Sequence, residues 1–236
     1  MNRYRIFILP CVIALLSILS CEKEATVITE SAVIRTFKGA IDLENLANYA
    51  NQTIPAYITK DNTSGNPITD KGATLGRVLF YDKNLSVNNT VSCASCHQQA
   101  FAFSDTAVAS KGVNGLTARH SMRLINARFG EEVKFFWDER ASSLEDQTSR
   151  PIQDHNEMGY SGQNGDPSIN DLITKLEAKD YYKELFTFVY GNDDITEAKI
   201  QQALAQFIRS IQSFDAKYDA GRSMVNKETD NFPNFT

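Results

Sequence analysis

The sequence predicts an all-α fold with long loops, and three observations lead to this prediction. After Thr196, apolar residues recur at spacings of three and four, which is the period of an amphipathic helix. This apolar stripe consists of Ile200, Leu204, Phe207, Ile208, Ile211, Phe214 and Tyr218. The alternation typical of strands is weak everywhere, and glycine and proline gather between the helical segments.

The first elements follow a mixed N-terminal region. Residues 41–49 are compatible with one short helix, and 59–67 is a polar loop rich in glycine and asparagine. The pattern predicts a helix over 69–81 that begins with a capping threonine and ends at the turn residues 82–84. The glycines of residues 111–117 indicate another loop.

A second helix is expected to open at Ser142, because Glu145 follows three residues later as in a capping box. Pro151 ends this helix after about two turns, since proline lacks the N–H that a helix interior needs. Residues 151–167 then form a long irregular loop. A loop of that length inside a compact domain is usually functional.

Two more helices precede the final one. Ser168 and Asp171 form a capping box for a helix whose apolar residues fall at helical spacing. Residues 181–190 continue as a helix that stops at Gly191.

The most informative motif is Cys93-Ala94-Ser95-Cys96-His97, a C-x-x-C-H sequence typical of covalent haem c attachment. Two thiols three positions apart on one helical turn can bond to the two vinyl groups of one porphyrin, and His97 can bind the iron as axial ligand. A thioredoxin-like redox pair does not need the histidine. A zinc site would want a second Cys/His pair, which the sequence lacks. The motif therefore predicts one haem c.

The first twenty residues have the pattern of a signal peptide of the lipoprotein type. Arg3 and Arg5 precede the apolar run 6–19, which is short for a membrane span. Residues 18–21 resemble a bacterial lipobox in which Cys21 receives the lipid. An ordinary signal with an incidental Cys21 is the alternative. We expect an exported protein, in the periplasm or on an outer surface, that contacts the membrane only through Cys21.

The rest of the chain is long enough for one domain. Of its 236 residues, we interpret 21–65 as a tether and 66–225 as a single folded domain. The net charge of −5 and the lack of a basic run argue against nucleic acid as a partner. Cys11 leaves with the signal and the other three cysteines have roles, so none remains for a disulfide.

Several separated motifs around the haem sequence resemble one family. In order and spacing they are similar to the N-terminal, peroxidatic-haem domain of the bacterial dihaem cytochrome c peroxidases, the family that also holds the MauG-like enzymes. The motifs, besides the C-x-x-C-H, are residues 75–82, 103–105, Arg119, 126–127, 136–141, 144–147 and 157–159.

The resemblance runs over residues 70–220 and implies a cytochrome c-like helical domain with long loops covering the haem. Family members carry two such domains. The sequence contains one C-x-x-C-H, so residues 226–236 are interpreted as the start of a linker to an absent second domain. A second haem is expected only in that domain.

The resemblance also assigns roles around the haem. His97 is the proximal iron ligand, and Glu157 is the acid/base that moves a proton between the two oxygens of peroxide. Gln147 orients peroxide or water, and Pro151 closes over the pocket. Glu157 as a solvated loop carboxylate, Gln147 as an ordinary exposed residue and Pro151 as a plain helix stop are the alternatives.

Two further residues are implied to serve the cofactor. Arg119 falls on the family pattern as a cofactor-binding residue. Trp137, the only tryptophan, falls where the family places a tryptophan on the electron path between its haems. A tryptophan of the hydrophobic core is the alternative interpretation.

The other histidines mark departures from the family. Many relatives have an iron-blocking histidine in the loop that here spans 110–115 and contains none. We therefore expect a five-coordinate or water-bound ferric haem that needs no reductive activation. His120 replaces an asparagine that often helps to bind calcium, so calcium stays an open prediction. His155 precedes Glu157 by two residues, either as a replacement iron ligand or as an exposed side chain.

The resulting functional prediction is a cytochrome-c peroxidase that reduces hydrogen peroxide to water, with electrons from a small cytochrome or another one-electron donor. MauG-like oxidation of a protein substrate is the second hypothesis. A non-catalytic electron carrier is the third. Such carriers often have His/Met axial ligands, and Met122, Met158 and Met224 are the candidates.

Overall fold

The computed structural model describes residues 30–130 and 134–235. The predicted signal peptide and the predicted lipid site at Cys21 lie outside this part of the chain. Within it the all-α prediction is confirmed, because the only strand-like pairings are isolated bridges. The helices are α1 (Ala32–Phe37), α2 (Asp70–Tyr81), α3 (Cys93–Cys96), α4 (Leu144–Ser149), α5 (Ile169–Glu177), α6 (Asp180–Tyr190), α7 (Glu197–Arg209) and α8 (Lys217–Arg222), with short 3-10 turns at Lys83–Leu85, Gln99–Phe101 and Ala127–Phe129.

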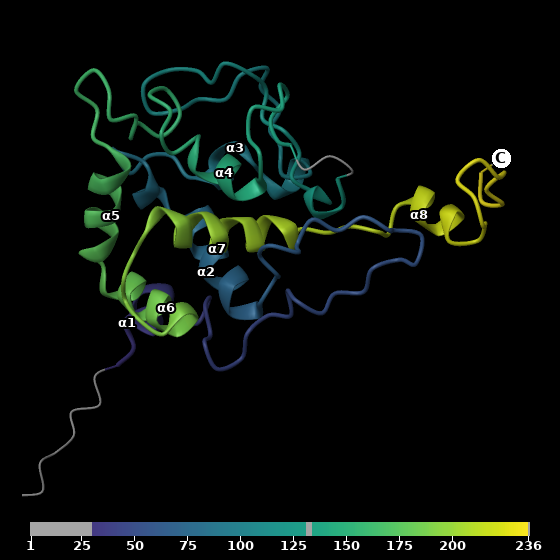
Figure 1. The fold of residues 1–236 in the computed structure, drawn as a ribbon, viewed down its shortest axis with the longest axis horizontal. Helices are drawn as coiled ribbons and strands as arrows, with labels where there is room; N and C mark the ends of the chain where they lie inside the picture. The colour runs from purple at the N-terminus through teal and green to yellow at the C-terminus, as the bar shows by residue number, and fades with distance from the viewer. Residues whose placement is uncertain (1–29, 131–133, 236) are drawn as a thin grey trace, which may run out of the picture. The chain divides into compact units, whose positions relative to one another are not determined.

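The packing of α2 against α7 is the most extensive between any two described helices (Figure 1). At the crossing, a Cβ on Gly76 would lie 2.0 Å from the carbonyl oxygen of Ala203, so only a glycine permits this approach. The short helix α3 packs on α2, and α4 packs on α7. The helix pair therefore forms the scaffold that carries the C-x-x-C-H motif and the following site elements.

Most predicted helices are confirmed, with shifts at their ends. Thr69 caps α2, Ser168 and Asp171 form the capping box of α5, and Gly191 ends α6 in the left-handed conformation. The predicted start of α4 at Ser142 is wrong by one residue. Ser143 is the cap, because its hydroxyl accepts a hydrogen bond from the N–H of Asp146. The N–H of Ser142 donates in turn to the Asp146 carboxylate.

The helix predicted to begin after Thr196, α7, is shorter than the apolar stripe predicts. It ends at Arg209, although the stripe continues to Tyr218. The reason is Asn126, which binds the chain after Arg209 in two ways. Its backbone N–H donates to the carbonyl of Ile211. Its side-chain amide accepts from the N–H of Ser213 and donates to the carbonyl of Ser213. These bonds occupy backbone groups that a longer helix would need.

The N-terminal part differs more from the prediction. The helix expected over 41–49 is absent, because the Asp42 carboxylate accepts hydrogen bonds from the N–H groups of Glu44 and Asn45 and fixes a turn. A helix lies instead at α1, where Val33 is fully buried. The compact unit begins at Ser31, so residues 31–65 of the predicted tether belong to it, and Val33 and Ile41 are part of its hydrophobic core.

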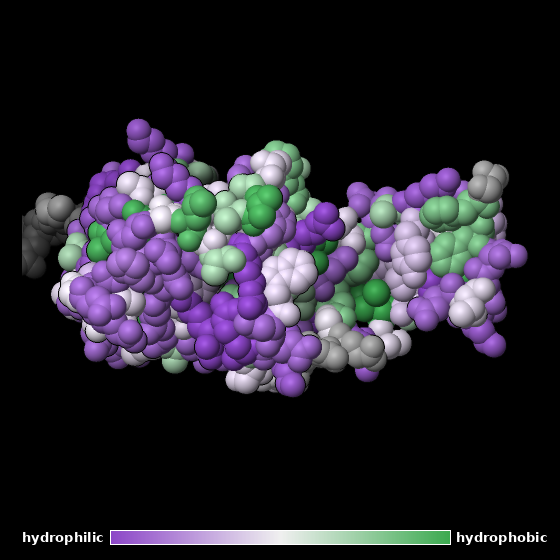
Figure 2. Space-filling model, turned by 90° about the horizontal axis from the view of Figure 1, so that it is seen from above, coloured by the Kyte–Doolittle hydropathy of each residue, from purple (hydrophilic) through white to green (hydrophobic). Residues whose placement is uncertain are grey.

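The face shown in Figure 2 is largely hydrophilic. On the face shown in Figure 2, apolar side chains occur in separate small groups among polar ones. No helix of the described part is long and apolar enough to cross a bilayer.

The glycine at the helix crossing gives a stability prediction. In an exposed helix, Gly→Ala stabilises by about 1 kcal/mol. Gly76→Ala is expected to destabilise the domain by roughly 1–3 kcal/mol instead, because the new methyl group meets the backbone of α7. Denaturant unfolding measures the effect.

Gly65→Ala is the matched control, since its Cβ would meet nothing within 4 Å. Equal midpoints for the two variants would contradict the close approach at Gly76.

Candidate functional site

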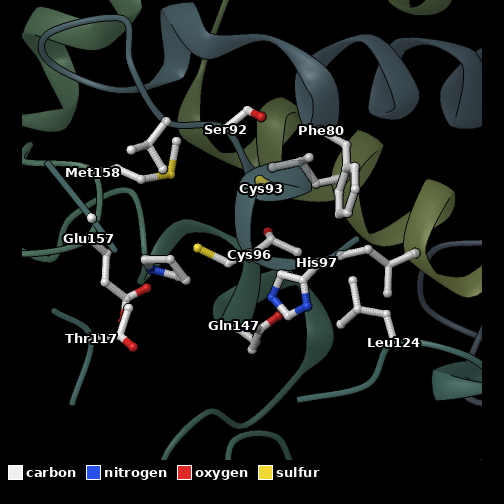
Figure 3. Close-up of a pocket in the computed structure, with 16 residues that line it drawn as sticks. Phe80, Ser92, Cys93, Cys96, His97, Thr117, Leu124, Gln147, Glu157 and Met158 are labelled. Atoms are coloured by element: carbon white, nitrogen blue, oxygen red, sulfur yellow. The ribbon is translucent and has the colours of Figure 1, made fainter. Parts of the chain in front are cut away.

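The two cysteines of the motif lie on the single turn of α3. Ser92 and Ser95 cap this turn reciprocally, with the N–H of Ser92 donating to Ser95 Oγ at 3.0 Å. The N–H of His97 donates to the carbonyl of Cys93 at 2.9 Å and closes the turn. Both thiols are free and line the same cavity as the imidazole (Figure 3). The turn thus presents all three groups to one space.

His97 is oriented for metal binding. Its Nδ1 lies 2.8 Å from the carbonyl oxygen of Phe103 and 3.2 Å from the hydroxyl of Ser121. Ala102 and Phe103 both have positive φ, 58° and 54°, which turns this carbonyl back toward the ring. A carbonyl only accepts, so Nδ1 carries the proton and Nε2 keeps its lone pair for a metal. Burial lowers the pKa of His97, which favours the neutral imidazole.

The site consists of two adjoining cavities of about 70 and 510 Å³. The smaller cavity is mostly apolar. It is lined by Cys93 and by Phe80, Leu204 and Ile208 of the helices α2 and α7. The larger one reaches Arg119 and Trp137. Both are lined by Cys96, His97, Thr117, Leu124, Gln147, Pro151 and Glu157.

Glu157 lies on the wall of both cavities. Its N–H donates to the Asp154 carboxylate at 3.0 Å, and its carbonyl accepts from the N–H of Val113 at 3.0 Å. In the view of Figure 3 its carboxylate points toward Thr117. Burial, and then the charge of Asp154, raises the pKa of Glu157 to about 7, against an opposing effect of Arg140. Such a carboxyl group can both take up and release a proton near neutral pH.

Gln147 and Pro151 also line both cavities, as the resemblance implies. Two threonines that the sequence analysis did not single out join them. Thr117 Oγ1 accepts from the N–H of Ser110 at 2.9 Å and donates to the carbonyl of Arg119 at 2.8 Å. Thr148 lies beside Gln147 on α4 and lines the smaller cavity. Neither has a motif of its own, so only the fold identifies them.

Trp137 lies at the outer end of the larger cavity rather than in the core. Its side chain is 60% exposed, and its indole N–H donates to the carbonyl of His120 at 3.0 Å. The interpretation of Trp137 as a core residue is therefore wrong. Arg119 lines the same cavity and pairs with Asp138 at 2.9 Å.

The remaining histidines make contacts of their own. His155 Nδ1 lies 2.7 Å from the Asp166 carboxylate, and His155 lines neither cavity. The interpretation of His155 as an exposed side chain fits these contacts. His120 Nδ1 lies 2.6 Å from the carbonyl oxygen of Ala107. Among the described residues, no group of three or more His, Cys, Asp or Glu side chains could hold a metal ion.

The donor set fits haem c. Two unpaired thiols on one turn and a neutral imidazole with a free Nε2 face a cavity with apolar walls, which is what a covalently bound porphyrin requires. Cys93, Cys96 and His97 would hold the group. Burial raises the pKa of Cys93 to about 12, so this thiol stays protonated in the folded chain.

Comparisons with known proteins identify the family of the chain. A family profile described as "Di-haem cytochrome c peroxidase" matches residues 70–227. The methylamine utilization protein MauG of Methylophilus methylotrophus is 33% identical over 65% of this chain and 44% of that protein. The cytochrome c551 peroxidase of Nitrosomonas europaea is 31% identical over 62% of this chain and 42% of that protein.

A solved structure is also similar. The crystal structure of a MauG-like protein associated with microbial copper homeostasis superposes with a TM-score of 0.63. The two sequences are 32% identical, and the alignment covers 72% of this chain and 49% of the MauG-like protein. The chain spans less than half the length of the relatives reported above.

The donor set gives a direct prediction for the cofactor. In a cell that matures c-type cytochromes, the double variant Cys93→Ala, Cys96→Ala is expected to lose covalent haem, because both thioether positions are gone. Haem staining after denaturing electrophoresis measures the loss. Ser95→Ala, which keeps both thiols, is the control and retains the stain. A stained double variant would refute attachment at α3.

Proposed function

The chain belongs to the di-haem cytochrome c peroxidase family, and from this premise we propose that its domain reduces hydrogen peroxide to water at a haem c bound to Cys93, Cys96 and His97. One observation carries the proposal. Glu157, a carboxyl group with a pKa of about 7, lines the same cavity as the two thiols and the imidazole. A plain electron carrier does not need such a group, whereas peroxide cleavage does.

When bound, the haem would supply the redox-active iron through which two electrons, delivered one at a time by the donor, reach peroxide. The chain's own residues move the protons. Glu157 in its ionised form accepts a proton from one oxygen of hydrogen peroxide and returns it to the other, which leaves as water. The reaction consumes two electrons and two protons and forms two water molecules.

Gln147 positions the substrate for this transfer. Its amide group offers both a donor and an acceptor on the cavity wall, so it can orient peroxide by hydrogen bonds. Pro151, at the end of the same helical segment, limits the space beside it. The burial that raises the pKa of Glu157 also keeps bulk water from competing for its proton.

The partners and location follow from the same proposal. Electrons come from a small cytochrome or another one-electron donor. The protein acts after export, with a lipid on Cys21 as its only attachment to the membrane. Trp137, exposed at the outer end of the cavity, lies on the electron path to the haem. Calcium binding near His120 is not part of the proposal, since that imidazole faces a carbonyl and a hydroxyl.

Two observations favour other functions. Relatives named MauG are 33% identical to the chain, which favours oxidation of a protein side chain with the same haem chemistry. Met158 is buried and lines the cavity, which favours a carrier with His/Met ligation. Steady-state peroxide consumption with reduced cytochrome c as donor supports the peroxidase. The far-red charge-transfer band of a His/Met haem would favour the carrier.

The raised pKa of Glu157 predicts a pH profile. Its base form takes up the proton, so the rate of reaction of the haem-loaded protein with peroxide should rise with pH through about 7 and then level off. Glu157→Gln should lower the rate by roughly 10²–10⁴-fold and remove the rise. Stopped-flow absorption at a series of pH values measures both effects.

Asp154→Asn provides the matched variant. It removes the charge that raises the pKa of Glu157 but keeps an oxygen that can accept from the N–H of Glu157. The inflection should move to lower pH with little change in the plateau. An unchanged inflection would mean that another group controls the rate.

The histidine-free loop predicts the state of the resting haem. The ferric protein should show the absorption and electron paramagnetic resonance of a five-coordinate or water-bound haem, since residues 110–115 offer no imidazole. His155→Ala should leave these spectra unchanged, because His155 is bonded to Asp166. A low-spin bis-histidine spectrum at neutral pH that disappears in His155→Ala would reverse this assignment.

A further inference from the structure

The two ends of the site differ in chemistry. The end beside Cys93 is apolar, because Phe80, Leu204 and Ile208 form its wall. The outer end is basic, although the chain as a whole carries a net charge of −5. We call this outer end the cationic mouth, and its basic residues are Arg119, Arg123, Lys134 and Arg140.

Three of these four cations have acidic partners. Asp138 accepts from Arg119 at 2.9 Å and from Arg140 at 2.8 Å. Lys134 Nζ lies 3.6 Å from the Glu139 carboxylate.

Arg123 differs from the other three. It is exposed and makes no ion pair or hydrogen bond with any residue of the described chain. Counting only residues 30–130 and 134–235, a single Asp138 shared by two arginines leaves the mouth with an excess of positive charge, and Arg123 is the cation without an acidic partner there. The guanidinium group is thus free to bind an anion that enters the cavity.

The shape of haem matches this polarity. Its two vinyl groups lie along one side of the porphyrin, and its two carboxylates lie along the other. Thioether bonds to Cys93, which lines only the inner cavity, and to Cys96, which lines both, would place the vinyl side toward the inner, apolar part of the site. The carboxylates would then lie toward the outer end, where a guanidinium group can pair with them.

We propose that Arg123 binds a haem carboxylate at the cationic mouth, with two hydrogen bonds from its planar guanidinium group. Such bidentate pairs are the strongest form of this contact, and a lysine can replace them only as a point charge. The inference depends on haem attachment at Cys93 and Cys96 but not on peroxide chemistry.

The contact has a measurable electrostatic consequence. A positive charge that neutralises the carboxylate disfavours the ferric haem, which carries one more positive charge than the ferrous form. Removing the guanidinium group should therefore stabilise the ferric state. It should also leave the carboxylate with a higher pKa, so that its protonation follows the oxidation state of the haem.

Redox titration of the purified holoprotein tests the proposal. Arg123→Gln is expected to shift the midpoint potential to a more negative value and to make it depend more strongly on pH. Arg123→Lys should restore part of the potential, since it keeps the charge and loses the two-pronged geometry. Arg77→Gln, an exposed arginine of α2 that lines neither cavity, is the control and should match the wild type.

Each outcome decides a separate point. If Arg123→Gln has the potential and the pH dependence of the Arg77→Gln control, the carboxylate contact is refuted. If the potential shifts as expected while peroxide is not consumed, the contact stands and the peroxidase proposal fails. Circular dichroism of each variant verifies the fold, which an exposed residue without contacts should not affect.

Discussion

The close contact between α2 and α7 is the constraint on which the site depends. Because residue 76 has no side chain, the two helices approach until the backbone of one meets the backbone of the other. Phe80, one turn further along α2, then faces the ring of His97 at 6.4 Å between centroids. Leu204 and Ile208 of α7 line the cavity behind the cysteines. The apolar floor of the proposed haem site is thus a direct result of this crossing.

Helix α4, which carries Gln147, is held against α7 by an ion pair. Arg209, almost fully buried at the end of α7, forms two contacts with the Glu145 carboxylate of α4 and a third with Asn62. Burial raises the pKa of Glu145, but the hydrogen bonds from Arg209 and Asn66 and the charge of Arg209 together outweigh this effect, so the pKa of Glu145 lies below its ordinary value. Since breaking one partner of a buried pair leaves an uncompensated charge, α4 is held firmly in place. Gln147 and Pro151 therefore reach the cavity from a fixed position.

Local sequence signals predicted the parts of the fold that local interactions determine. The caps at Thr69 and Ser168 and the C-x-x-C-H turn were predictable because their hydrogen bonds join residues three or four apart. The early end of α7 was not, because Asn126 binds its backbone from a distant part of the chain.

The contrast between local signals and contacts from distant parts of the chain also separates the predictable and unpredictable parts of the site. Glu157 and Gln147 were singled out from a family resemblance, and both line the cavity beside the C-x-x-C-H motif. Thr117 and Arg123 lie on a segment without a helical or strand pattern and carry no motif. They join the site only through the folding of that segment around the outer cavity.

The loop without a histidine has a structural role that explains how Glu157 is held. Gly112 lies so close to the backbone of Asn156 that a Cβ would be 2.0 Å from its carbonyl oxygen. The N–H of Val113 donates to the carbonyl of Glu157, and that of Asn114 donates to the carbonyl of Asn156. Where the family resemblance implies a ligand that blocks the iron, this chain has a loop that holds Glu157, the residue we propose as acid/base. The residues 110–115 therefore favour a site that is open to substrate and ready for proton transfer.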